Sequence, residues 1–135
     1  MPTMIFVNLP VADLQKSTAF FESLGFSFNP QFTDETAACM VVSDTIYAML
    51  LTHEKFRSFT PKSICDAKKS TEVLVCLSCE NRAQVDDYVR KAVAGGGSTF
   101  RPAQDHGFMY EHAFQDLDGH IWEVMYMDPS AVNPS

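Results

Sequence analysis

The predicted secondary-structure elements of this chain occur twice in the same order. An apolar, β-branched stretch predicts a first strand, a helix follows it, and three short strands separated by polar turns complete the half. The second half repeats this order from a new apolar strand onwards. We therefore expect one α+β domain of two tandem βαβββ units, with a generic α+β sandwich and coincidental repetition as the alternative. The predicted strands span residues 5–11, 26–32, 37–42 and 46–51, and then 72–79, 99–102, 108–115 and 120–127.

The ends of both predicted helices carry matching signals. Asp13 and Asn81 are polar residues of the kind that cap a helix N-terminus. Gly25 and the glycines at 95–97 supply the left-handed backbone on which helices end. An apolar stripe on the second helix is predicted to consist of Val85, Val89 and Val93.

The two units are predicted to cover residues 1–52 and 71–135, joined by a linker at residues 53–70. The linker holds five of the 10 basic residues of the chain. A basic, polar stretch of this length suits a solvated crossover, and a lid over a binding site is the alternative.

Composition narrows the function classes. The 10 Lys and Arg residues against 17 Asp and Glu give a net charge of -7, which repels nucleic-acid phosphates and anionic lipid. The first ten residues lack the pattern of a secretory signal, and no apolar run approaches the length of a membrane span. We therefore expect a cytoplasmic protein with no nucleic-acid or membrane partner. The C-x-x-C at Cys76 and Cys79 falls in a predicted strand, where its thiols point to opposite faces, and this favours a structural role.

Glu123 is the most informative single residue. It lies in the middle of the last predicted strand, where alternation places it on one face with Ile121 and Met125. A carboxylate among apolar neighbours is costly unless it is paired, bound to a metal or open to a wet cleft. Each of these situations makes Glu123 a candidate site residue.

The turn before this strand suggests a partner for Glu123. With residues 116–119 as the loop, His112 lies across from Glu123 and Tyr110 lies across from Met125. A His–Glu pair could form half of a metal site, an acid/base dyad or a buried ion pair. A slip of one residue in the register would remove the pair. Glu123 and His112 are the predicted catalytic candidates.

Two further residues stand out. His106 precedes Gly107 on a predicted loop, where it could close over a cleft or lie on the surface. Asn8 interrupts the first apolar strand and shares a face with Phe6, either as a satisfied core amide or as an amide that orients a ligand.

Several stretches of the sequence match a known pattern. They are Phe-Val-Asn-Leu-Pro-Val-Ala-Asp-Leu at 6–14, Ser17 with Ala-Phe-Phe-Glu-Ser-Leu-Gly-Phe at 19–26, and Phe-Gln-Asp-Leu-Asp-Gly-His-Ile-Trp-Glu-Val at 114–124. Through them, nearly the whole chain resembles the vicinal oxygen chelate superfamily, which includes glyoxalase I, bleomycin- and fosfomycin-resistance proteins and extradiol dioxygenases. More narrowly, residues 31–35, 69–73 and 105–109 look like those of bacterial predicted lactoylglutathione lyases. The resemblance implies the glyoxalase/bleomycin resistance/dihydroxybiphenyl dioxygenase fold, in which two βαβββ units form a curved mixed sheet.

The resemblance also implies where a metal would bind. In metal-dependent members, His or Glu ligands come from the first and last strand of each unit. Only one of the four corresponding side chains here, Glu123, can serve as such a ligand. We therefore expect no standard metal site and no cofactor; a Zn, Ni, Fe or Mn ion would need Glu123 with His112 or Glu72. The four corresponding positions are Phe6, Ala48, Leu74 and Glu123.

Because three of the four ligand positions cannot bind a metal, we rank a metal-free function first. The first is a protein that binds a small molecule in an apolar cleft, as bleomycin-resistance-like members do. The second is a divalent-metal-dependent lyase or dioxygenase of the glyoxalase I type, and the third is metal-free acid/base catalysis. By resemblance, a homodimer is the expected assembly. The predicted ligand-binding residues are Phe6, Asn8, His106, Tyr110 and Met125.

Overall fold

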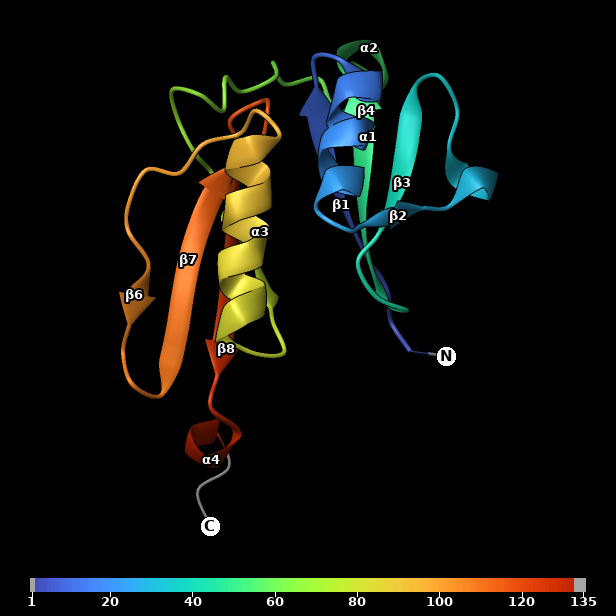
Figure 1. The fold of residues 1–135 in the computed structure, drawn as a ribbon. Helices are drawn as coiled ribbons and strands as arrows, with labels where there is room; N and C mark the ends of the chain where they lie inside the picture. Colours follow the sequence, from blue (N-terminus) through green and yellow to red (C-terminus); the bar gives the residue numbers. More distant parts are fainter. Residues whose placement is uncertain (1, 133–135) are drawn as a thin grey trace. The chain divides into compact units, whose positions relative to one another are not determined.

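The computed structural model describes residues 2–132 of the chain, so Met1 and residues 133–135 of the predicted units lie outside the described part. The chain forms two compact units, Met1–Asp66 and Ala67–Ser135 (Figure 1). Each unit contains its own four-stranded mixed sheet with a helix, as expected for an α+β protein of two βαβββ repeats.

The N-terminal unit has the strand order β1-β4-β3-β2. β1 pairs with β4 in parallel, and the other neighbours are antiparallel. The predicted strand at 26–32 is much shorter than expected, because Asn29 caps a 3-10 helix that begins at Pro30, a residue without a backbone donor. The elements are β1 (Ile5–Val11), α1 (Leu14–Ser23), β2 (Ser27–Phe28), η1 (Pro30–Phe32), β3 (Ala37–Val41), β4 (Ile46–Thr52) and α2 (His53–Arg57).

The two faces of this sheet differ. Side chains of alternate residues, including Leu9, Val11 and Leu50, are buried together with Phe20 and Phe21 of α1. The opposite face carries Phe6, Asn8 and Tyr47 because side chains alternate along a strand. The start of the predicted linker is a short helix, α2, which packs against β1 and β4.

The C-terminal unit has the corresponding strand order β5-β8-β7-β6. The predicted strand at 99–102 is wrong: Ser98 forms an isolated bridge with Gln115, and the next strand begins at Gln104. The Thr99 hydroxyl donates to the backbone oxygen of Ala113 at 2.7 Å, so a side chain makes the contact in place of a strand ladder. The elements are β5 (Val75–Ser78), α3 (Arg82–Ala94), β6 (Gln104–Asp105), β7 (Met109–Gln115), β8 (Ile121–Met127) and α4 (Pro129–Val132).

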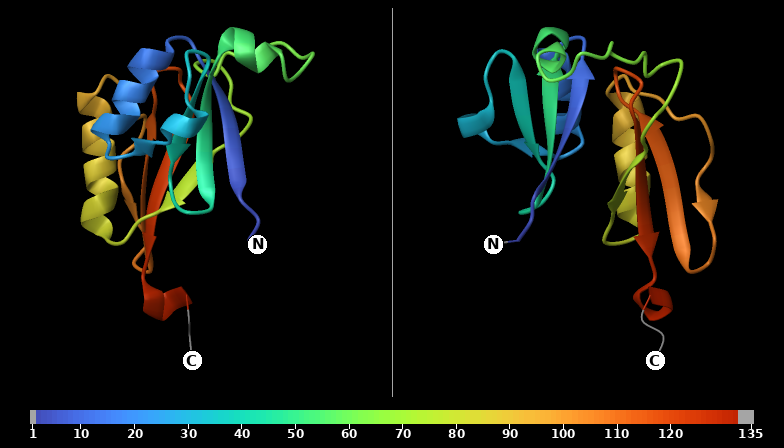
Figure 2. Two further views of the ribbon diagram at one scale, coloured as in Figure 1. Left: turned by 90° about the vertical axis from the view of Figure 1, so that its right-hand side faces the viewer. Right: turned by 180° about the vertical axis from the view of Figure 1, so that it is seen from behind.

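Helix α3 covers one face of this second sheet (Figure 2). Its buried stripe consists of Val85, Val89 and Ala92, whereas the predicted Val93 is 48% exposed. At about 100° per residue, a position seven residues along the helix returns to the starting face and one eight residues along has turned past it. The stripe packs against the core of the sheet, in which Phe114, Trp122 and Val124 are buried.

The turn between β7 and β8 is one residue longer than predicted. The buried Asp116 carboxylate accepts bonds from the backbone of Asp118 and His120, and from Trp122 Nε1 at 3.0 Å. This arrangement keeps His120 in the turn, so the first pair of the ladder is Gln115 with Ile121. Burial raises the pKa of Asp116. Every pair in the hairpin is therefore shifted by one residue from the prediction.

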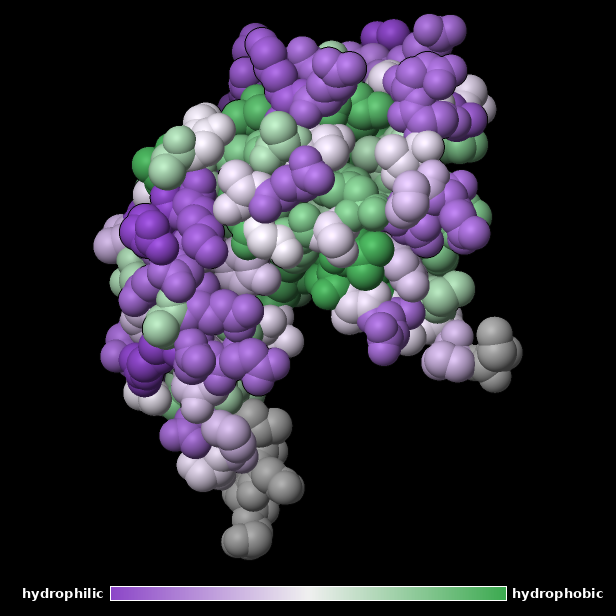
Figure 3. Space-filling view, turned by 45° about the vertical axis from the view of Figure 1, so that its right-hand side comes forward, coloured by the Kyte–Doolittle hydropathy of each residue, from purple (hydrophilic) through white to green (hydrophobic). Residues whose placement is uncertain are grey.

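Hydrophilic and hydrophobic side chains both reach the surface (Figure 3). None of the helices within residues 2–132 is long and apolar enough to cross a membrane. The exposed large apolar side chains include Phe6, Phe32, Phe59, Val73, Leu74, Phe100 and Phe108.

Candidate functional site

Glu123 lies on the face of the C-terminal sheet opposite α3. It pairs with Cys76 of β5 and Ala113 of β7, so all three side chains are on this face. Glu111 and Met125 pair with each other and lie on the same face. We call this the Glu123 face. The Glu123 side chain is 29% exposed, so it is partly removed from water.

The predicted pair of His112 and Glu123 is wrong. His112 pairs with Val124, so its side chain is on the α3 side of the sheet. Its Nε2 donates to the backbone oxygen of Arg101 at 2.9 Å. The cause is the longer turn, which shifts the register by one residue and moves His112 to the other face. An acid/base dyad of His112 and Glu123 is thereby excluded.

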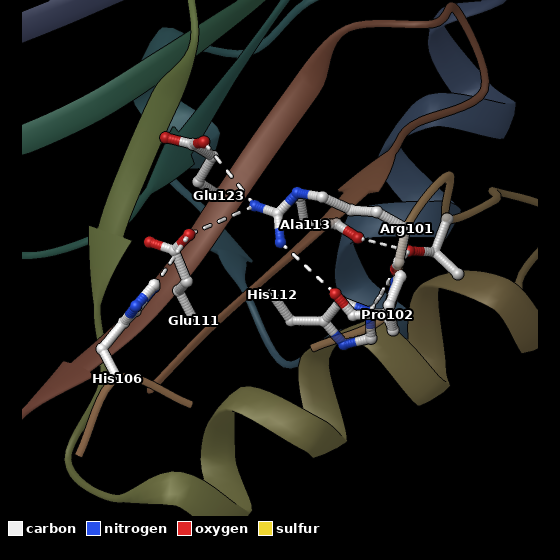
Figure 4. A network of polar contacts seen from close by, with 8 residues as sticks. Arg101, Pro102, His106, Glu111, His112, Ala113 and Glu123 are labelled. Atoms are coloured by element: carbon white, nitrogen blue, oxygen red, sulfur yellow. Dashed lines mark hydrogen bonds and ion pairs between the residues drawn. The ribbon is translucent and has the colours of Figure 1, made fainter. Parts of the chain in front are cut away.

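The actual partner of Glu123 is Arg101 (Figure 4). The Arg101 Nη2 atom lies 3.8 Å from a carboxylate oxygen of Glu123 and 3.8 Å from one of Glu111. His112 reaches the Arg101 backbone from the other face of the sheet, and so anchors the segment from which the guanidinium extends. The site thus holds two carboxylates that share one guanidinium.

His106 joins the same network, and Tyr110 does not. The His106 Nε2 atom lies 3.8 Å from Glu111 Oε1, which places this predicted ligand-binding residue at the Glu123 face (Figure 4). Tyr110 pairs with Tyr126, not with Met125, and its hydroxyl donates to Asp86 of α3 at 2.6 Å. The predicted position of Tyr110 across from Met125 is wrong because of the same one-residue shift in register that displaced His112.

The network includes two residues that the sequence analysis missed. Glu111 could have been found from the alternation of β7, because it is a charged residue two positions before Ala113 on the same face. Arg101 carried no such signal. It lies in an irregular segment, and only the folded chain shows where its long side chain reaches.

The thiols of the C-x-x-C are shifted away from reactivity. Burial, and then the charges of Glu123 and Glu111, raise the pKa of Cys76, which lies on the Glu123 face. Burial raises the pKa of Cys79 to about 11. Both cysteines are free. A raised pKa keeps a thiol protonated and poorly nucleophilic at neutral pH.

A second candidate site lies in the N-terminal unit. A hollow of about 440 Å³ is lined by Asn8, Phe56, Phe59 and Thr60. Asn8 is exposed, which excludes the core amide, and its Nδ2 donates to the backbone oxygen of Phe6 at 3.3 Å. Nothing in the described part of the chain donates to its side-chain oxygen, so that oxygen is free to accept a bond. We call this the Asn8 hollow.

Aromatic side chains surround the first strand. The Phe6 ring stacks on Tyr47 of β4 with 4.8 Å between centroids and 10° between planes. Phe59, at the rim of the hollow, is 63% exposed, and the Lys55 Nζ atom lies 5.4 Å from its ring centroid. Phe56 and Phe59 were not among the predicted site residues because they fall in the predicted linker, although their spacing of three residues is a helical signal.

The residues present do not fit the standard metal site of the resembled superfamily. Register corrects one of the four positions: Ala48 pairs with Val7 and is buried in the core, whereas Met49 pairs with Asn8 as Glu123 pairs with Cys76. Met49 is no better a ligand for a hard divalent ion. Glu72, proposed as a substitute, is exposed and precedes β5. Within residues 2–132 no three His, Cys, Asp or Glu side chains cluster in a way that could hold a metal.

Comparison with known families agrees with this fold. The family model described as Bleomycin resistance protein-like N-terminal matches residues 3–43. No curated protein matches the chain. A hypothetical protein from S. aureus is 27% identical, with a TM-score of 0.78 over 93% of this chain and 95% of that chain.

Solved structures with family names in their descriptions have the same fold. A glyoxalase/bleomycin resistance protein/dioxygenase family enzyme from Burkholderia phytofirmans PsJN is 15% identical, with a TM-score of 0.76 over 93% of this chain and 99% of that chain. A glyoxalase-related enzyme from Fulvimarina pelagi is 19% identical, with a TM-score of 0.75 over 93% of this chain and 88% of that chain. The chain therefore has the fold of the vicinal oxygen chelate superfamily, and the predicted resemblance to that superfamily is confirmed. The narrower likeness to lactoylglutathione lyases stays a prediction.

Proposed function

We propose that this glyoxalase/bleomycin-resistance-like protein binds a small, largely apolar molecule and does so without the standard metal site of its superfamily. The observation that carries the proposal is the Asn8 hollow, which combines two aromatic walls with one unused amide oxygen. Small-molecule sites are mostly apolar hollows in which a few polar groups fix the orientation of the ligand. The expected ligand has an aromatic or aliphatic body and a hydrogen-bond donor directed at Asn8.

The arrangement around Glu123 supports the metal-free part of this proposal. Three of the four ligand positions carry Phe6, Met49 and Leu74, which leaves Glu123 alone. Arg101 already supplies a positive charge to that carboxylate and to Glu111. A guanidinium in this place balances the charge that a divalent ion would otherwise neutralise. The homodimer and the cytoplasmic location remain predictions.

Binding at the Asn8 hollow is tested with a neutral fluorescent probe, N-phenyl-1-naphthylamine, because the net charge of -7 disfavours anionic dyes. We expect saturable binding that F59A weakens about tenfold, since a ring that a ligand covers on one side contributes about 1.4 kcal/mol, a little less than a fully buried ring. F32A is the matched control, because Phe32 is 64% exposed against 63% for Phe59 and does not line the hollow. Equal losses in F59A and F32A would reject a specific site.

Metal analysis tests the other half of the proposal. Protein purified without chelators and without a metal-binding tag is expected to contain no stoichiometric Zn, Ni, Fe or Mn. One equivalent of any of these ions that disappears in E123Q contradicts the metal-free proposal and favours the glyoxalase I type of chemistry.

A further inference from the structure

The loop that carries His106 receives little support from its own backbone. β6 has only two residues, and a strand of this length makes few ladder bonds with β7. Within the loop, the His106 amide donates to the backbone oxygen of Met109 at 2.8 Å, and Gly107 has a φ of +84°. The Asp128 amide also donates to the Phe108 backbone oxygen at 2.8 Å, and side chains from elsewhere in the unit add to these few backbone bonds.

Arg82, the first residue of α3, makes two such contacts with the loop and a third with the adjoining strand β7. Its Nη1 donates to Asp105 Oδ2 at 2.7 Å, and its Nη2 donates to the backbone oxygen of Gly107 at 3.2 Å. The guanidinium carbon also lies 5.1 Å from the ring centroid of Tyr110, whose hydroxyl is held by Asp86. The bond from Arg82 lowers the pKa of Asp105, so this carboxylate stays ionised at neutral pH. Two hydrogen bonds and one stacked ring fix the plane of the guanidinium.

These contacts are on the opposite face of the sheet from the charged network. Tyr110 points toward α3, as its bond to Asp86 shows. His106 reaches Glu111 on the Glu123 face, at 3.8 Å. Arg82 on the helix side of the sheet thus contacts the same loop that carries His106 on the other side.

We propose that Arg82 is a positioning residue that latches residues 104–108 from the helix side, so that His106 stands against Glu111 on the Glu123 face. This inference goes beyond the proposed function, because the latch can be measured with no ligand present. Since Arg82 and Asp105 are 43% and 55% exposed, the latch also weakens as added salt screens the ion pair.

The first test is amide hydrogen exchange in the full, ligand-free chain by NMR. In R82A we expect exchange at His106 and Gly107 to rise roughly 2- to 5-fold, as loss of an exposed ion pair allows, while Val89 in the core of α3 is unchanged. R82K keeps a charge for Asp105 but has one donor nitrogen in place of two, so its exchange rates should fall between those of R82A and the unchanged chain. The matched control is R90A, which removes an exposed ion pair with Asp87 on the same helix and should leave the loop unchanged.

The second test measures whether the NMR shifts of the His106 ring respond to a change at Glu111. In the otherwise unchanged chain, E111Q should move the ring carbon and proton shifts of His106. In the R82A background the same substitution should move them much less, and R82K should restore part of the response. A general loss of stability in R82A would not by itself remove the response of the His106 shifts to E111Q.

Two results would overturn the proposal. One is loop exchange in R82A that equals that of the unchanged chain or of R90A. The other is an equal response of His106 to E111Q with and without Arg82. Because neither measurement uses N-phenyl-1-naphthylamine or the Asn8 hollow, failure of the latch leaves the binding proposal standing, and the reverse also holds.

Discussion

Arg101 is the residue on which the charged groups of the C-terminal sheet depend. Its guanidinium lies 3.8 Å from the carboxylates of both Glu111 and Glu123, and all three side chains are between 21% and 29% exposed. Partial burial strengthens these ion pairs beyond those of a fully exposed surface. Without Arg101, two like charges would share one face with no cation between them. Removing the arginine should therefore cost more than removing one glutamate.

The interaction between Arg101 and Glu123 can be measured in a double-mutant cycle. R101M should lower the free energy of unfolding by about 1–2 kcal/mol, and E123Q by less than about 1 kcal/mol, because E123Q also relieves repulsion with Glu111. The double variant R101M/E123Q should lose less free energy of unfolding than the sum of the losses in the two single variants. Urea unfolding measures all three against R90M, whose exposed ion pair should contribute little. Strict additivity would show that Arg101 and Glu123 do not interact.

Glu123 could be predicted from the sequence, but its partner Arg101 could not. Glu123 could be found because a charged side chain in an alternating apolar strand has few inexpensive explanations. Arg101 could not be found in this way, since it lies outside any strand. Its contact with Glu123 of β8 joins two segments that are distant in the sequence. His112 was assigned to the wrong face because its position depended on the exact length of one turn.

The hairpin of β7 and β8 is the element that determines the site. Its turn runs from Asp116 to His120, and the Asp116 carboxylate closes it by accepting two backbone bonds. The side chain therefore adds one residue to the loop that local turn signals indicate. The helix caps and helix ends follow from local chemistry and were predicted correctly. Register also depends on the burial of this carboxylate and on its bond from the Trp122 indole, which local rules on turns do not include.

Gly119 in this turn provides the second prediction. Its φ is +90°, and a Cβ atom would lie 2.9 Å from the backbone nitrogen and Cα of Lys68. G119A should therefore lower the free energy of unfolding by roughly 2–3 kcal/mol, through left-handed strain together with a backbone clash. G107A is the matched control: its φ is +84° but nothing lies within 4 Å, so strain alone should cost about 1 kcal/mol. Equal losses in thermal or urea unfolding would show that the contact with Lys68 is absent in solution.

At the scale of the whole molecule, the chain consists of two units with the same topology. Both have the order first strand, fourth, third, second, and both leave one sheet face free of their long helix. The repeat was visible in the sequence because caps, glycines and apolar runs recur in order. What the two free faces carry differs: aromatic rings and an amide in one unit, and carboxylates with a guanidinium in the other. The repeat therefore predicts the fold of each unit but not its chemistry, which depends on segments outside the repeated strands.

The connection between the units gives the last prediction. Residues 58–74, all within the described part of the chain, form no helix or strand, and most of them are exposed. Brief digestion with trypsin should cut first after Lys62. Lys68 and Lys69 are exposed as well, but the Lys68 backbone packs against the turn at Gly119, which holds that stretch in place. Mass spectrometry should then find fragments 1–62 and 63–135, and K62Q should delay their appearance. First cuts after Arg90 or Lys91 would instead mean that α3 opens more readily than the connection, contrary to its buried stripe.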